Sequence, residues 1–154
     1  MRKHFMSLLF ALLPFSAMAQ ELTMSALFQA MPDSLMPYLT RNNRLDMIDF
    51  MEAHMKAEVT NLFDAKSEMT FLSPDSLSIK MNGVLRVEMK LVKTGETADS
   101  SHVTVAVKRT YMLNENQTES IVDVYTSAWC RLSSRPGPSS VLRRDDEIFA
   151  RPHF

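Results

Sequence analysis

Cysteine and glycine are scarce in this sequence of 154 residues, which contains one cysteine and three glycines. The single cysteine, Cys130, excludes an intrachain disulfide, so the fold must be stabilised by its hydrophobic core. The glycines at positions 83, 95 and 137 are isolated, whereas a loop that cradles phosphate groups needs glycines at a fixed, close spacing. The sequence therefore predicts neither a disulfide-stapled scaffold nor a nucleotide-binding loop.

An excess of positive charge and a long apolar run are also missing. The chain has 17 Lys and Arg against 18 Asp and Glu, a net charge of −1. A nucleic-acid-binding domain would present a basic face, so we expect no nucleic-acid partner. The run from Phe5 to Phe15 is too short to span a bilayer, which takes about 20 residues. No second apolar segment is long enough either, so we expect no transmembrane segment.

The first residues have the order of a secretory signal peptide. Arg2 and Lys3 precede the apolar stretch Phe5–Phe15, and Ala17-Met18-Ala19 fits a small-x-small cleavage site. We predict cleavage between Ala19 and Gln20. Because Gln20 is not a cysteine, lipid anchoring at this junction is not expected. The prediction is a periplasmic or extracellular protein. Cleavage removes Arg2 and Lys3, so the mature chain keeps 15 of the 17 Lys and Arg and all 18 Asp and Glu.

The N-terminal part of the mature chain has a helical period. Leu27, Phe28 and Met31 follow helical spacing, and Pro32 ends that segment because the residue before a proline disfavours the α region. A second helix is predicted from an N-cap at Asn43 to about Phe63. Its apolar positions are Leu45, Ile48, Met51, Met55, Val59 and Leu62.

From about Lys66 the apolar period changes to two, which is typical of strands with one buried face. For the hairpin around Asn82-Gly83 we predict a three-residue loop, 81–83, with Gly83 in the left-handed conformation. This register pairs Ile79 with Leu85 and keeps the apolar residues of both strands on one face. Further strands are predicted at 102–113, 120–126 and 129–132, after a polar connector at 94–101.

These elements predict an α+β fold, with N-terminal helices packed on one face of an antiparallel β-meander of five or six strands. The strands are joined by short polar loops, whereas parallel strands would need long crossovers. We divide the chain into a signal peptide (1–19), a single domain (20–132), a Pro/Ser linker (133–140) and a C-terminal arm (141–154). The linker is inferred from its composition, SSRPGPSS.

Two groups of side chains on the second predicted helix are candidates for metal binding or catalysis. Met47, Met51 and Met55 form a stripe that could hold Cu(I), although methionine more often fills irregular gaps in a core. Asp46 and Asp49, with Glu52 beside them, could support acid–base chemistry or bind Ca²⁺, although a solvated helix face explains them as well. We favour the structural interpretation for both groups. No cofactor and no metal site is predicted.

Cys130 follows a tryptophan in an apolar stretch, and three roles are open to it. We favour a buried thiol that packs as a small hydrophobic group. The alternatives are a disulfide between chains and a reactive nucleophile. No serine lies in a nucleophile-elbow motif.

Three blocks stand out in the first part of the mature chain: AMPDSL at 30–35, NRLDMIDFM at 43–51 and KAEVTN at 56–61. Together they resemble a family of secreted proteins from Bacteroidales that is known only as a domain of unknown function. The resemblance implies an exported protein and carries over no catalytic residue. It also implies O-glycosylation at Asp-Ser/Thr-apolar triplets, which places candidate sites at Ser34 and Ser76.

The sequence thus predicts an exported, non-enzymatic binding module of the periplasm or cell envelope. Its partner would be an envelope protein, a peptide or a glycan. The alternative is a small hydrolase that uses carboxylates such as Asp46 and Asp49, and a third possibility is a purely structural envelope protein. The hydrolase requires those carboxylates to line a concave pocket.

Overall fold

The computed structural model describes residues 21–93, 103–114 and 117–136, which form two α-helices, one 3₁₀ helix and one antiparallel sheet. The predicted signal peptide with its cleavage site, the connector at 94–101 and the C-terminal arm lie outside the described residues. The helices are α1 (Met24–Ala30), η1 (Asp33–Leu35) and α2 (Arg41–Glu52). The strands are β1 (Ala57–Thr60), β2 (Lys66–Leu72), β3 (Ser76–Lys80), β4 (Leu85–Lys93), β5 (Val103–Asn114), β6 (Gln117–Thr126) and β7 (Arg131–Pro136).

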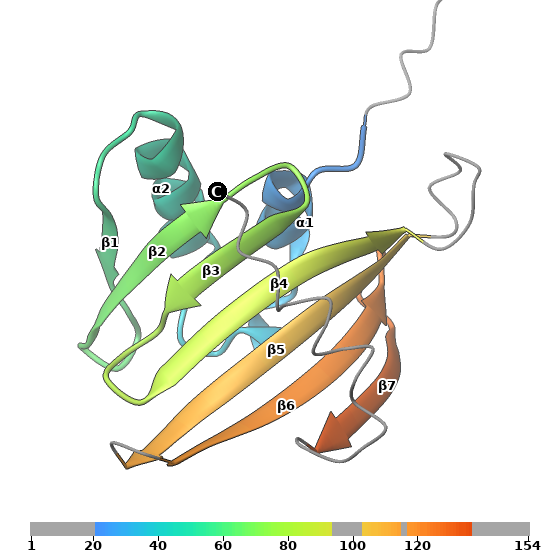
Figure 1. Ribbon diagram of the computed structural model, residues 1–154. Coiled ribbons are helices and arrows are strands. Elements are labelled where there is room, and N and C mark those ends of the chain that lie inside the picture. The colour runs from blue at the N-terminus through green and yellow to red at the C-terminus, as the bar shows by residue number, and fades with distance from the viewer. Residues whose placement is uncertain (1–20, 94–102, 115–116, 137–154) are drawn as a thin grey trace, which may run out of the picture.

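The seven strands lie in the sheet in the order of the sequence, and each pairs antiparallel with the next (Figure 1). This confirms the α+β class and the meander, but the strand number is seven rather than five or six. The additional strand is β1, which was predicted to be helical. Both α-helices cover the same face of the sheet, with α2 against β1 and β2 and α1 against α2 and β4.

The core lies between the helices and this sheet face and is rich in methionine. Seven methionines are at most 2% exposed: Met24, Met31, Met36, Met47, Met69, Met81 and Met89. Along β4, residues from Leu85 to Leu91 alternate between buried and more exposed positions, as the period of two predicted. Methionine has an unbranched, adaptable side chain, so it can fill the gaps between short helices and a twisted sheet.

Helix α2 begins earlier and ends much earlier than predicted. The N-cap is Thr40, whose hydroxyl accepts the N–H of Asn43, while the Asn43 side chain accepts the N–H of Thr40. At the other end, the N–H of Met55 donates to the Phe50 carbonyl (2.8 Å) and that of His54 to Met51 (3.1 Å). These two bonds form a Schellman motif.

The prediction of a helix to Phe63 was wrong because its termination signal is not a glycine. His54 has a φ of 55°, in the left-handed region that helices use to end and that glycine usually occupies. The chain then enters β1, where Ala57 and Val59 are buried and Glu58 and Thr60 are more exposed. In so short a segment, apolar residues can fit either period, so the spacing did not separate strand from helix.

The register of β3 and β4 differs from the prediction by two residues. Ile79 pairs with Val87, and Leu77 pairs with Met89. The side chain of Asn82 accepts the N–H groups of Val84 and Leu85, which produces a longer loop, and Gly83 is not in the left-handed region. A shift of two keeps the same residues on the buried face, so the apolar pattern fixed the face and left the register open.

The C-terminal strand is longer than predicted and includes part of the predicted linker. Residues 133–136 belong to β7 and pair with β6, for example Ser134 with Asp123. The linker prediction is therefore wrong for these four residues, because pairing with β6 satisfies their backbone whatever their composition suggests. The remainder of that segment, from residue 137, lies outside the described residues.

Candidate interaction surface

Exposed apolar side chains gather at one end of the sheet. In an antiparallel meander, the turns after β1 and β3 and the last residues of β5 lie at the same end, which is the lower left of Figure 1. Of nine exposed large hydrophobic residues in the described part of the chain, three lie on these two turns and two at the end of β5. We call this set the tip surface: Leu62, Phe63, Val84, Met112 and Leu113.

The segments that carry the tip surface are connected to one another by hydrogen bonds. The side-chain amide of Asn61, in the first turn, donates to the carbonyl of Met81 at the start of the second (3.3 Å). The N–H of Met112, near the end of β5, donates to the carbonyl of Val84 in the second turn (2.8 Å). These bonds hold the two turns and the end of β5 together at one end of the sheet.

The first turn, residues 61–65, is built around the buried side chain of Asn61, which is 4% exposed. Its oxygen accepts the N–H groups of Phe63 (2.9 Å) and Ala65 (3.2 Å), and its amide also donates to the Ser67 hydroxyl (2.9 Å). Asp64 takes a left-handed φ of 57°, which turns the chain back into β2. Asn61 thereby holds this turn in one conformation.

Every backbone N–H from residue 62 to 65 has a partner within the chain. The N–H of Leu62 donates to the carbonyl of Tyr38 (3.0 Å), and that of Asp64 donates to the carbonyl of Asn61 (3.1 Å). The ring of Tyr38 also contacts the ring of Phe63, with centroids 5.0 Å apart. Because these donors do not rely on water, the turn can be covered by a partner without leaving an unpaired N–H group.

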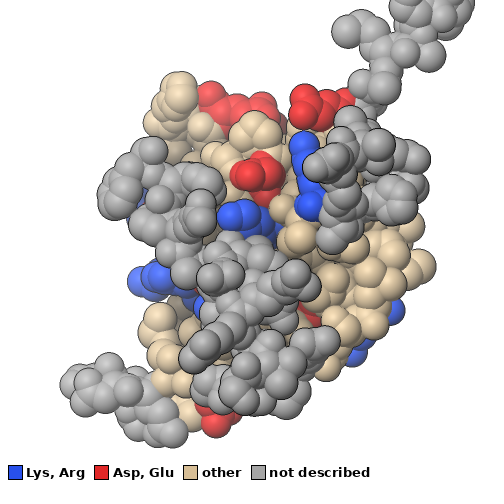
Figure 2. All heavy atoms as spheres, turned by 45° about the vertical axis from the view of Figure 1, so that its right-hand side comes forward, with Lys and Arg blue, Asp and Glu red and all other residues tan. Residues whose placement is uncertain are grey.

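Charge is mixed on the described surface. Figure 2 shows both basic and acidic side chains on the face that it displays, without an extended field of one sign among the described residues. The tip surface has Asp64 between Phe63 and the strand, and the exposed Lys66 follows it. This surface offers apolar contact with a polar margin.

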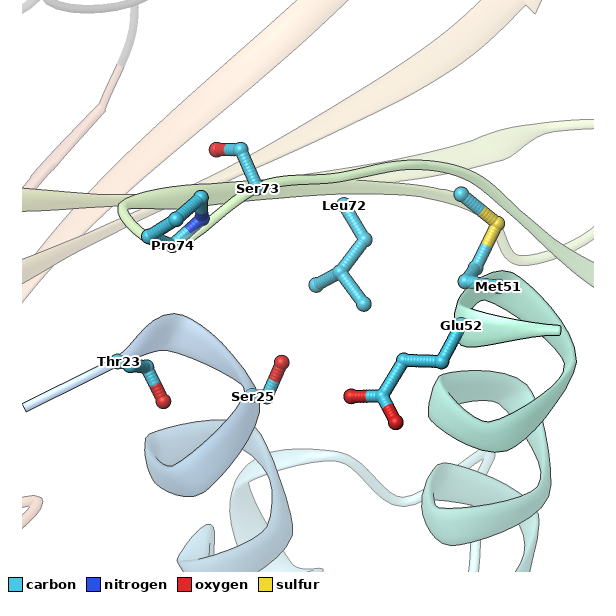
Figure 3. Close-up of a pocket in the computed structure, with 7 residues that line it drawn as sticks. All are labelled: Thr23, Ser25, Met51, Glu52, Leu72, Ser73 and Pro74. Carbon is cyan, nitrogen blue, oxygen red and sulfur yellow. The ribbon is translucent and has the colours of Figure 1, made fainter. Parts of the chain in front are cut away.

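A cleft of about 390 Å³ lies at the opposite end of β2 from the first turn. It is lined by Thr23 and Ser25 of the α1 start, Met51 and Glu52 of the α2 end, Leu72 of the β2 end, and Ser73 and Pro74 of the β2–β3 turn. In Figure 3 the side chains of Leu72 and Glu52 project into the space between the two helices and the turn.

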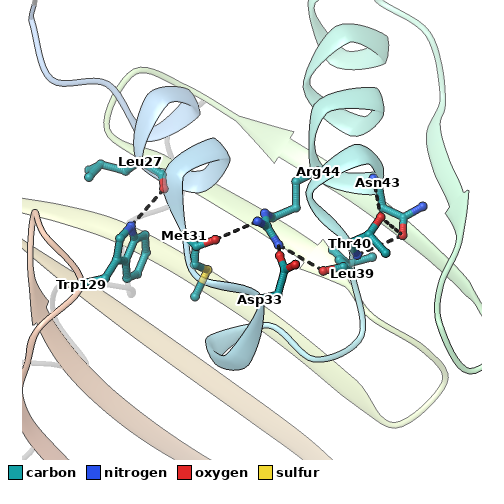
Figure 4. A network of polar contacts seen from close by, with 8 residues as sticks. All are labelled: Leu27, Met31, Asp33, Leu39, Thr40, Asn43, Arg44 and Trp129. Carbon is teal, nitrogen blue, oxygen red and sulfur yellow. Dashed lines mark hydrogen bonds and ion pairs between the residues drawn. The ribbon is translucent and has the colours of Figure 1, made fainter.

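A buried arginine that the sequence reasoning missed organises the segment between the helices. Arg44 is 1% exposed and forms an ion pair with Asp33 (2.8 Å) while donating to the carbonyls of Met31 (2.7 Å) and Leu39 (3.1 Å) (Figure 4). Its guanidinium also lies 6.0 Å from the centre of the Phe28 ring. The charge of Arg44 therefore stabilises the segment between the helices. Nothing in the local sequence pattern distinguishes Arg44 from an arginine on the surface.

A second long-range contact fixes the β6–β7 turn. Trp129 has a left-handed φ of 62°, and its indole N–H donates to the carbonyl of Leu27 in α1 (3.2 Å), as Figure 4 shows. Trp129 is buried, whereas the adjacent Cys130 is exposed. The prediction of a buried thiol is therefore wrong, because the left-handed turn directs the tryptophan into the core.

The carboxylates and methionines of α2 do not form the sites that their spacing suggested. Asp46, Asp49 and Glu52 are exposed, as expected for a solvated helix face, and only Glu52 lines the cleft. Met47 is buried, but α2 ends before Met55, so the three methionines do not form one helical stripe. Within residues 21–93, 103–114 and 117–136, no group of three or more His, Cys, Asp or Glu could hold a metal ion.

The two candidate glycosylation sites differ in accessibility. Ser34 is exposed in η1. Ser76 is half-buried at the start of β3, where its hydroxyl donates to the Asp75 carboxylate (3.1 Å) and shares a hydrogen bond with Ser73 (2.9 Å). Modification of either serine stays a prediction, and the structure favours Ser34.

Comparison with known proteins places the fold and the family. The chain has the α+β architecture of a solved domain of an uncharacterised protein from Porphyromonas gingivalis W83, a member of the Bacteroidales, with a TM-score of 0.56 and 23% sequence identity. That similarity covers 71% of this chain and 52% of the other, so this chain spans about half the length of the solved one.

The family model described as "Protein of unknown function (DUF3256)" matches residues 15–141, and the chain belongs to this family. The resemblance to a domain of unknown function is confirmed to that extent. A search of curated proteins finds no match. In the described part of the chain, the helices are too short and too polar to cross a membrane.

Proposed function

We propose that this protein is an exported, non-enzymatic binding module of the periplasm or cell envelope, and that it binds a protein partner through the tip surface. The observation that carries the proposal is the concentration of five exposed apolar side chains on two turns and the end of β5, which hydrogen bonds connect. Single exposed apolar residues are ordinary, but a group of them at one end of a domain favours an interaction site.

The fixed conformation of the first turn favours the binding of a partner that removes water from the tip surface. Leu62 and Phe63 are 60% and 65% exposed, although the turn beneath them is held by Asn61. A preorganised turn loses little conformational entropy on binding, so more of the apolar contact energy becomes affinity. The N–H groups of residues 62–65 are already hydrogen-bonded within the chain, so a partner that covers the turn leaves none of them unpaired and avoids that desolvation cost.

The composition of the surface favours a protein over a bilayer. A charged residue, Asp64, lies beside Phe63 in the first turn, where insertion into a bilayer would require its carboxylate to lose water. An aromatic and aliphatic centre with a polar margin is the usual anatomy of a protein interface. Tyr38 and Phe63 are the aromatic anchors that such an interface uses.

Export is supported by the N-terminal sequence, with its basic start, apolar stretch and small-x-small triplet. Cell fractionation with mass spectrometry of the N-terminus tests it. The expected result is a mature chain that begins at Gln20 in the periplasmic or extracellular fraction. An intact N-terminus on a cytoplasmic protein would contradict this part of the proposal.

A photo-crosslinking amino acid placed at position 63 in living cells tests the binding surface. The matched control is the same amino acid at Leu132, which is 57% exposed on β7, away from the tip surface. A partner captured at position 63 and not at 132 is then purified for affinity measurement. We expect Phe63→Ser to weaken its binding about 10-fold or more, as for an interface anchor, and Leu132→Ser to leave it unchanged. Equal capture at both positions, or equal affinity of both variants, would refute the proposal.

A further inference from the structure

The cleft between α1, α2 and the β2–β3 turn has a chemistry that the tip surface does not share. Its walls come from three elements that are already fixed to one another. The N–H of Met24, at the first turn of α1, donates to the carbonyl of Pro74 in the β2–β3 turn (2.7 Å). The hydroxyl of Ser73 accepts the N–H of Ser76 (3.1 Å), which holds that turn closed. The cleft is therefore preformed, as binding sites for small groups usually are.

The lining combines an apolar wall with one negative charge. Met51, Leu72 and Pro74 supply apolar surface, and Glu52 supplies a carboxylate that projects into the cleft (Figure 3). Glu52 is the last residue of α2, so it lies at the end of the helix dipole that carries partial negative charge. None of the seven lining residues is basic, so the local charge is negative.

No residue in the described part of the chain pairs with Glu52, whose carboxylate forms no hydrogen bond or ion pair there. A carboxylate beside apolar walls is complementary to a cation that is attached to a carbon chain. The cation pairs with the carboxylate, which is otherwise exposed to water, and the carbon chain of the ligand covers Leu72 and Met51. An anion would be repelled, and one carboxylate is too few ligands for a Ca²⁺ site.

We infer that this cleft binds an alkylammonium group, a primary ammonium on a short carbon chain. Glu52 pairs with the ammonium, the hydroxyl of Ser25 adds a hydrogen-bond acceptor, and Leu72 contacts the methylenes. Two sources present this chemistry, a lysine side chain of a peptide and a free aliphatic diamine. The cleft is at the other end of β2 from the tip surface, so this inference does not rest on the proposed function.

Titration of the isotope-labelled mature chain, followed by amide NMR shifts, tests the inference. The probes are N-acetyl-lysine methylamide for the peptide source, cadaverine for the free diamine, and n-pentanol as the uncharged control. We expect saturable shifts at Ser25, Glu52 and Leu72 with the two amines and much weaker effects with the alcohol. Tighter binding of the lysine derivative identifies a peptide as the source, and tighter binding of cadaverine identifies a diamine.

Two matched variants complete the test. Glu52→Gln keeps the shape of the side chain and removes its charge, and it is expected to weaken amine binding at least about 5-fold. Asp49→Asn removes an exposed carboxylate of the same helix that does not line the cleft, and it is expected to change the affinity less than 2-fold, within the ordinary effect of a screened surface charge. Absence of saturable shifts in the parent chain, or equal loss in both variants, would overturn the inference.

Discussion

Replacing Asn61 with alanine should destabilise the protein far more than the same change at another turn asparagine. Asn61 lies 4% exposed and forms four hydrogen bonds. Its amide donates to the Ser67 hydroxyl and the Met81 carbonyl, and its oxygen accepts two backbone N–H groups of the first turn. Alanine removes all four and leaves the turn without its internal support.

The magnitude follows from the number of bonds. Each intramolecular hydrogen bond contributes about 0.5–1.5 kcal/mol net. Water can reach the two N–H groups in the turn, and Ser67 keeps its own bond to Met81 (2.6 Å), so the loss is smaller than the full sum. We expect Asn61→Ala to lower the free energy of unfolding by about 2–4 kcal/mol, which is a large fraction of the 5–15 kcal/mol of a typical domain.

Asn82→Ala is the matched control, because Asn82 also closes a turn through its side-chain oxygen. It accepts only two N–H groups, from Val84 and Leu85, and neither bond is fully buried, unlike the bonds of Asn61 to Ser67 and Met81. We expect a loss of about 0.5–1 kcal/mol. Urea denaturation of both variants measures the difference, with an expected fall of the midpoint of about 1–2 M for Asn61→Ala. Equal stability of the two variants would show that the Asn61 contacts do not support the tip surface.

Four further predictions follow from the described contacts. Arg44→Lys cannot reproduce the contacts to one carboxylate and two carbonyls, and denaturation should show a loss of about 2–4 kcal/mol, whereas full stability would refute the network. Trp129→Phe should lower stability by about 1–2 kcal/mol through loss of the indole hydrogen bond and contact area, and an unchanged melting curve would contradict it. Cys130 should react with a thiol reagent in the native state, and protection until unfolding would disprove its exposure. The hydrogen bond from Lys56 lowers the pKa of Glu58. The pair therefore stabilises the fold above the ordinary glutamate pKa, and this stabilisation is lost as the pH falls through the lowered pKa. NMR titration should show a higher pKa of Glu58 in Lys56→Met than in the parent protein.

Local patterns were sufficient for most of the strands and for the buried face of the sheet. Residues 76–91 alternate with a period of two, and the structure buries the residues that this period assigned to the core. The first helix ends at Ala30, and Met31, the residue before Pro32, is extended as expected, since the proline ring acts on the residue before it. Such signals are short-range, so a single sequence carries them.

The candidate surfaces could not be predicted in the same way. Leu62 and Phe63 were placed inside a helix, and the signal that ends this helix is a left-handed histidine, His54, which has no sequence signature comparable to glycine. The grouping of Val84 with these residues depends on how three hairpins align. Asn61 gains its importance from Ser67 and Met81, which only the folded sheet brings to it.

The sequence by itself determined the class of fold, the apolar face of the sheet and the lack of any intrachain disulfide, because periodicity and composition act within a few residues of chain. Tertiary structure decided the register of β3 and β4, the burial of Arg44 and the exposure of Cys130. Each of these depends on partners distant in sequence: Arg44 binds carbonyls of the segment between the helices, and Trp129 reaches α1 across 102 residues and leaves Cys130 outside. A shift of two residues in register preserves every buried face, so only the contacts of the turns could select one.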